Sequence, residues 1–180
     1  MSVLADFQFA LGKTLAASWY QLVGFASESP QAKNNISSQV TSQTDSERKI
    51  ALLKRILQKF PYWSGGHLVL GALQLSERMQ RAAFASALAA KNLRGDTDID
   101  ARYLMARVYL SSGRGLDALT LLESLQQQLP ERYDIIEDLA AAQMQNGDNF
   151  AALTQLEKIP EQMRSKHSQV VLSHLRQKIQ

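Results

Sequence analysis

The chain of 180 residues has no cysteine, only four prolines, a low aromatic content of 7% and only three histidines. The missing cysteine excludes disulfide bonds, thiolate metal sites and a cysteine nucleophile. His167 and His174 are seven residues apart, or about 10 Å along a helix, too far to share one zinc ion. No nucleophile, base and orienting acid come together in the sequence. We therefore expect a protein that is not an enzyme and that has no cofactor and no metal.

What the chain does have is alanine, leucine and glutamine in large number, all of them residues that favour helices. The prolines lie at plausible helix boundaries, which agrees with this preference. The sequence therefore predicts an all-α protein.

Small residues recur in this chain at fixed offsets. Gly113 and Gly147, which are 34 residues apart, each separate the two halves of one copy of a pattern. The second copy reads Arg102-x2-Met105-Ala106-x2-Tyr109 and Ala118-x3-Leu122, the third Ile136-x2-Leu139-Ala140-x2-Gln143 and Ala152-x3-Leu156, and an earlier copy His67-x2-Leu70-Gly71-x2-Gln74 and Ala83-x3-Ala87. A unit of this length and pattern resembles the tetratricopeptide repeat (TPR), an array of helix-turn-helix hairpins.

The resemblance covers about residues 61–159, with a half-repeat helix before it over Lys49–Phe60. Its small residues would let paired helices approach to about 8–10 Å between axes. His67 stands where the family has a packing aromatic, so we expect a half-buried structural histidine there. Residues Glu161–Ile179 are predicted to form one last helix that caps the array, with an apolar side made of Met163, Val170, Val171, Leu175 and Ile179. The expected fold is a TPR-like helix-turn-helix solenoid with an N-terminal amphipathic helix and a C-terminal capping helix.

The N-terminal segment precedes this repeat domain. Its apolar residues follow helical spacing, which predicts an amphipathic helix over residues 1–26, then a flexible polar linker over 27–44 and the repeat domain over 45–180. Asp6 and Lys13 interrupt the apolar run, so a membrane span is not expected. Three roles remain open for this helix: it caps the array, lies on a membrane surface, or docks on a partner. Its contact residues would be Phe7, Leu11, Leu15, Trp19 and Leu22.

Charge is unevenly distributed along the sequence. Residues 49–95 carry eight basic and one acidic side chain, a net charge of +7, whereas residues 96–160 carry five basic and eleven acidic ones, a net charge of −6. This pattern is typical of solvated faces that keep a repeat array soluble. It is also what partner steering, or head-to-tail self-association through oppositely charged ends, would need.

The resemblance implies where a partner would bind. In the family, the first helix of each repeat lines a concave groove that contacts a peptide or an amphipathic helix. Packing against a neighbouring helix is the alternative role for Leu68 and Leu75. The groove positions in this sequence are Leu68, Ala72, Leu75, Tyr103, Arg107, Leu110, Glu137, Asp138 and Met144.

We therefore expect a cytoplasmic, non-catalytic adaptor or scaffold that binds a protein partner in this groove. The alternative is a peripheral membrane-associated or self-assembling structural subunit that uses the N-terminal helix and the oppositely charged ends. Nucleic acid is not an expected partner, because no aromatic platform lies between the basic residues.

Overall fold

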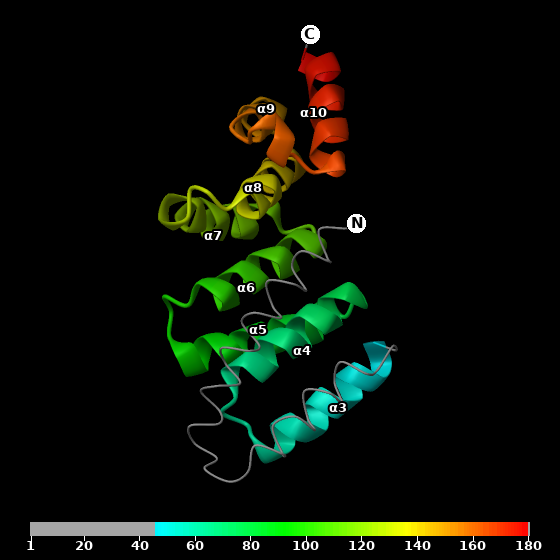
Figure 1. Ribbon diagram of the computed structural model, residues 1–180, viewed down its shortest axis with the longest axis vertical. Helices are drawn as coiled ribbons and strands as arrows, with labels where there is room; N and C mark the ends of the chain where they lie inside the picture. The colour runs from blue at the N-terminus through cyan, green and yellow to red at the C-terminus, as the bar shows by residue number, and fades with distance from the viewer. Residues whose placement is uncertain (1–45, 180) are drawn as a thin grey trace. The chain divides into compact units, whose positions relative to one another are not determined.

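The computed structural model describes residues 46–179, shown as coloured ribbons in Figure 1. The predicted N-terminal helix and the polar linker lie outside these described residues. Residues 46–179 form eight α-helices and one short 3-10 helix, without a β-strand among them, so the predicted all-α class is confirmed. The elements are α3 (Ser46–Lys59), α4 (Ser64–Ser76), α5 (Gln80–Arg94), α6 (Ile99–Ser111), α7 (Gly115–Gln128), α8 (Tyr133–Gln145), α9 (Asn149–Glu157), η1 (Glu161–Met163) and α10 (Lys166–Ile179).

The chain divides into two compact units, which meet in sequence between Leu104 and Met105, inside α6. In the first unit α3 packs against α4 and α4 against α5, and Figure 1 shows α4 and α5 lying side by side. In the second unit α8 packs against both α7 and α9, and α10 packs against α9. The consecutive helical hairpins predicted from the 34-residue period are therefore present in each unit.

The core of the first unit begins on α3. Four aliphatic side chains at helical spacing form its buried stripe, because only residues three, four or seven apart share one side of a helix. Trp63, in the turn after α3, is buried with them. The cluster consists of Ile50, Leu53, Ile56, Leu57, Trp63, Val69 and Leu70.

Close approach of helices explains the small residues. A Cβ atom on Gly71 of α4 would lie 2.8 Å from Cδ2 of Leu104 on α6 and 3.2 Å from Cβ of Ser86 on α5. Ala83, its partner position on α5, is fully buried. In the second unit, a Cβ on Gly115 at the start of α7 would lie 2.6 Å from Oδ1 of Asn146, at the end of α8. The predicted steric role of the small residues is thus confirmed at Gly71.

The turns inside the repeats share one backbone conformation. Gly113 and Gly147 have φ angles of 71° and 85°, in the left-handed region that glycine adopts without strain. The first repeat has Arg78 at the equivalent place, with a φ of 58°. Aspartates cap the following helices, since Oδ1 of Asp98 accepts from the backbone N–H of Ala101 and Oδ1 of Asp148 from that of Ala151.

The C-terminal helix differs from its predicted bounds and face. It begins at Lys166 rather than at Glu161, because the Ser165 hydroxyl accepts from the backbone N–H of Ser168 and so caps the helix. The buried residues of α10 are Ser168, Leu172 and Leu175, whereas Met163, Val170 and Ile179, predicted on the apolar side, are exposed.

Candidate functional site

The predicted groove residues of the first unit are largely buried. Leu68 and Tyr103 are each only 1% exposed, so neither side chain offers a surface to a partner. Ala72 and Leu75, on the same helix as Leu68, are half-buried.

In the second unit, two predicted groove residues form an ion pair. Nε of Arg107 on α6 lies 3.5 Å from Oδ2 of Asp138 on α8, and both side chains are less than one-fifth exposed. The Leu110 carbonyl, near the end of α6, accepts a hydrogen bond of 2.9 Å from Nε2 of Gln145 on α8. These contacts tie α6 to α8, so Arg107, Asp138 and the Leu110 backbone have structural roles.

The remaining two groove residues, Glu137 and Met144, line a pocket of about 350 Å³ in the second unit. One stripe of α8 forms one wall, since its lining residues are spaced three, four, seven and eight positions after Glu137. Helix α10 contributes a second wall, and α9 contributes Leu156. The lining consists of Glu137, Ala140, Ala141, Met144, Gln145, Leu156, His167, Ser168 and Val171. We refer to this space as the α8–α10 pocket.

Glu137 shapes the α8–α10 pocket by holding α10 in place. Its Oε1 accepts a hydrogen bond from the Ser168 hydroxyl and one of 3.3 Å from the backbone N–H of Ser165. A carboxylate at the start of a helix is also favoured by the helix dipole. The charge of Glu137 is thus engaged inside the protein, and most of the remaining lining is alanine, leucine, valine and methionine.

Seven of these nine lining residues were not among the predicted site residues. Three of the seven, His167, Ser168 and Val171, belong to α10, which the sequence indicated only as a cap. The sequence signal that could have indicated the pocket is the stripe from Glu137 to Met144 on α8. Such a stripe lines a pocket only when another helix lies beside it.

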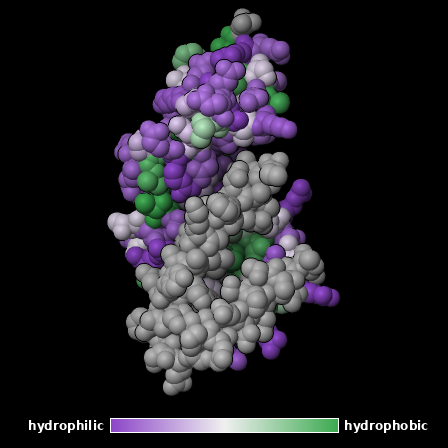
Figure 2. Space-filling view, in the orientation of Figure 1, coloured by the Kyte–Doolittle hydropathy of each residue, from purple (hydrophilic) through white to green (hydrophobic). Residues whose placement is uncertain are grey.

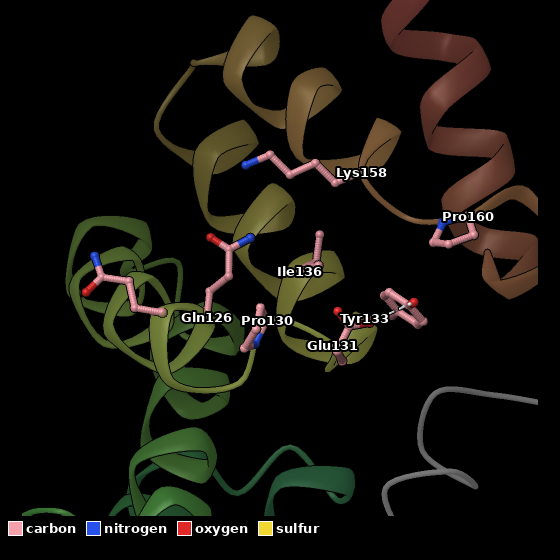
Figure 3. A pocket seen from close by; sticks show the side chains of 8 residues that line it. Gln126, Pro130, Glu131, Tyr133, Ile136, Lys158 and Pro160 are labelled. Carbon is pink, nitrogen blue, oxygen red and sulfur yellow. Dashed lines mark hydrogen bonds between the residues drawn. The ribbon is translucent and has the colours of Figure 1, made fainter.

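A second and larger pocket, of about 510 Å³, lies where α7, α8 and α9 end or begin (Figure 3). Its lining is more polar, with two glutamines, Glu131 and Lys158 beside Tyr133, Ile136 and two prolines. Two of the polar groups already have a hydrogen-bond partner beside the pocket, since Gln126 and Lys158 both donate to Oε1 of Gln155. Burial and the neighbouring Glu131 carboxylate raise the pKa of Tyr133, which keeps its hydroxyl protonated. This pocket has less apolar surface for a partner than the α8–α10 pocket.

Some apolar side chains of the described second unit are exposed outside the α8–α10 pocket. Figure 2 shows the second unit as mainly hydrophilic on the side in view, with a separate apolar area over α7. Leu116 on α7 and Phe150 on α9 are exposed, and single exposed apolar side chains are normal on protein surfaces. Among residues 46–179, no helix is both long and apolar enough to cross a bilayer.

These features define a class, the all-α helical-repeat proteins, built of hairpins with small residues at their closest contacts. More particularly, a family model described as tetratricopeptide repeat matches residues 109–172. The match supports assignment to the TPR superfamily and confirms the resemblance seen in the sequence. No curated protein and no solved structure matches the chain significantly. TPR domains generally bind other proteins, so the match over residues 109–172 supports a protein–protein interaction role in general terms.

Proposed function

We propose that this protein is a non-catalytic adaptor that binds an amphipathic helix or peptide of a partner protein, with one apolar anchor side chain in the α8–α10 pocket. The pocket itself carries the proposal. It combines a volume of about 350 Å³ with a mostly apolar lining, and α8 supplies one complete helical stripe to it. A helix laid in a groove places its anchor residues at the same three- and four-residue spacing.

Electrostatics favours an apolar anchor over a charged one. Glu137 binds Ser165 and Ser168, and Asp138 is paired with Arg107, so the carboxylates on this part of α8 already have partners. A cationic anchor would have to compete with those contacts. We therefore expect partner binding in the pocket to depend weakly on salt, because burial of apolar surface rather than ion pairing drives it.

Two adjacent residues of α10 allow a matched test. Val171 lines the pocket, whereas its neighbour Val170 is exposed and does not. We expect Val171→Glu to lose at least tenfold in partner affinity, since a desolvated carboxylate in an apolar pocket costs several kcal/mol. The control Val170→Glu adds the same charge to the same helix and should keep wild-type affinity.

The measurement is quantitative affinity capture from a lysate with the full chain and both variants, followed by titration of the partner common to wild type and Val170→Glu. Thermal unfolding of each variant establishes that the fold is retained. A second variant, Ala141→Phe, fills the pocket without adding charge and should give the same loss. If folded Val171→Glu and Ala141→Phe bind the partner as wild type does, the pocket is not the binding site.

A further inference from the structure

Helix α3 carries a strongly basic exposed side. Five of its fourteen residues are lysine or arginine and one is glutamate, a net charge of +4 on one helix. Arg55 and Lys59, four residues apart, lie opposite the buried stripe and are exposed, and Lys54 beside them is exposed as well. Because charges this close together repel, this side of α3 favours an anionic partner.

These three cations differ from several other basic residues of the described chain, which pair with carboxylates of the protein itself. Within residues 46–179, Lys54, Arg55 and Lys59 form no ion pair. In contrast, Arg94, Arg107 and Arg176 each face a carboxylate of the protein itself. The charge of the α3 side is therefore not neutralised by the described protein.

Two exposed aromatic side chains follow directly after these cations. Phe60 and Tyr62 are 38% and 84% exposed, although large aromatic side chains usually lie in a core. The turn does not need them for its shape. The buried side chain of Trp63 anchors the turn instead. It packs so closely on Gly66 that a Cβ atom at position 66 would lie 2.3 Å from the indole ring. A hydrogen bond of 2.9 Å between Nε2 of His67 and the Pro61 carbonyl oxygen also holds the turn.

We propose that α3 and this turn dock on an anionic lipid bilayer, with Arg55 and Lys59 over acidic headgroups and Tyr62 at the interface. Basic residues beside an exposed tyrosine suit the acidic headgroups and the polar interface of a bilayer. Single-stranded nucleic acid would instead be bound in a basic groove with aromatics between the cations, whereas here both aromatics lie at one end. This surface shares no residue with the α8–α10 pocket, so either proposal can fail alone.

Charge removal with a matched control tests the docking side. The full chain is sedimented with vesicles of phosphatidylcholine alone and of equimolar phosphatidylcholine and phosphatidylserine. We expect binding only to the anionic vesicles, and Arg55→Gln with Lys59→Gln should weaken it about thirtyfold, at roughly 1 kcal/mol for each charge near the surface. The control, Lys166→Gln with Lys178→Gln on α10, lowers net charge equally and should bind as wild type does.

Equal loss in both double variants would overturn the proposal, because net charge alone would then explain binding. Unchanged binding in the α3 variant would overturn it too. Tighter binding to single-stranded RNA than to anionic vesicles, lost in the same α3 variant, would replace lipid by nucleic acid as the partner.

The absence of cysteine permits a second, local readout. A single cysteine in Tyr62→Cys can be labelled with a polarity-sensitive fluorophore, and Met163→Cys, also at an exposed position, serves as the control. We expect a blue shift on anionic vesicles for the label at position 62 alone. Vesicle binding without that shift would mean that another part of the chain makes the contact, and the proposal would fail.

Discussion

At the scale of single residues, the turn between α4 and α5 departs from the rule that the other repeats follow. Gly113 and Gly147 have positive φ angles without strain, whereas Arg78 has a φ of 58° with a full side chain. A non-glycine residue in the left-handed region costs about 1–2 kcal/mol, because Cβ crowds the carbonyl oxygen that follows it. The sequence marks this turn in two repeats by glycine, but nothing in the first repeat reveals that Arg78 adopts the same conformation.

The first prediction concerns this strain. Arg78→Gly should stabilise the protein by about 0.5 kcal/mol, since the relief at the turn exceeds the added freedom of the unfolded chain. Urea denaturation measures the change. The control is Glu77→Gly, whose φ of −87° is ordinary for any residue, so this change should lower stability. Equal effects of the two substitutions would mean that the turn stores no strain.

At the scale of elements, the repeat depends on helices that approach closely at glycine and alanine. Gly71→Val tests this in the first unit, because the new side chain would meet Leu104 and Ser86 at distances below normal contact. We expect a loss of about 1–3 kcal/mol from overpacking. Its neighbour Ala72 is half-buried, and Ala72→Val should cost only the lower helix propensity, about 0.6 kcal/mol. Chemical denaturation of both variants gives the comparison, and a smaller loss for Gly71→Val than for Ala72→Val would refute the packing argument.

The elements also show how far the sequence could predict this fold. Helical spacing and the glycine turns located the hairpins between α4 and α9, because both signals are local. The face of α10 was not predictable in that way. Its buried stripe includes Ser168, which hydropathy assigns to the surface. In the structure the Ser168 hydroxyl donates a hydrogen bond to Glu137 on α8, which compensates its burial.

The candidate site follows the same division between local and non-local signals. The α8 wall of the pocket, with Glu137 and Met144, was within reach of a repeat pattern. The α10 wall depends on which side of that helix packs inward. Contacts between residues distant in sequence determine this, namely the burial of Leu172 and Leu175 and the hydrogen bond from Ser168 to Glu137. Tyr103 and Leu68 were predicted as groove residues because position within a repeat does not reveal whether a side chain is covered.

At the scale of the whole molecule, the sequence overstates how far positive and negative charges are separated in the folded chain. Many acidic residues between positions 96 and 160 have basic partners within the protein: Asp98 pairs with Arg94, Asp117 with Arg114, Asp134 with Arg132, Asp138 with Arg107 and Glu157 with Arg176. The first and last described helices, α3 and α10, both carry a net positive charge. Oppositely charged ends, which head-to-tail assembly would need, are therefore not a property of these two helices.

The net positive charge of both α3 and α10 predicts how salt affects assembly of the full chain. If these two helices repel each other, light scattering should give a molecular mass that does not fall as salt is added. Screening reduces the Debye length from about 30 Å at low ionic strength to about 8 Å at physiological salt, so contacts between exposed charges would weaken over that range. The α3 variant, Arg55→Gln with Lys59→Gln, and the α10 variant, Lys166→Gln with Lys178→Gln, should have the same mass as wild type at every salt concentration. A mass that decreases with salt in wild type, and is already low in either variant, would instead establish self-assembly through α3 and α10.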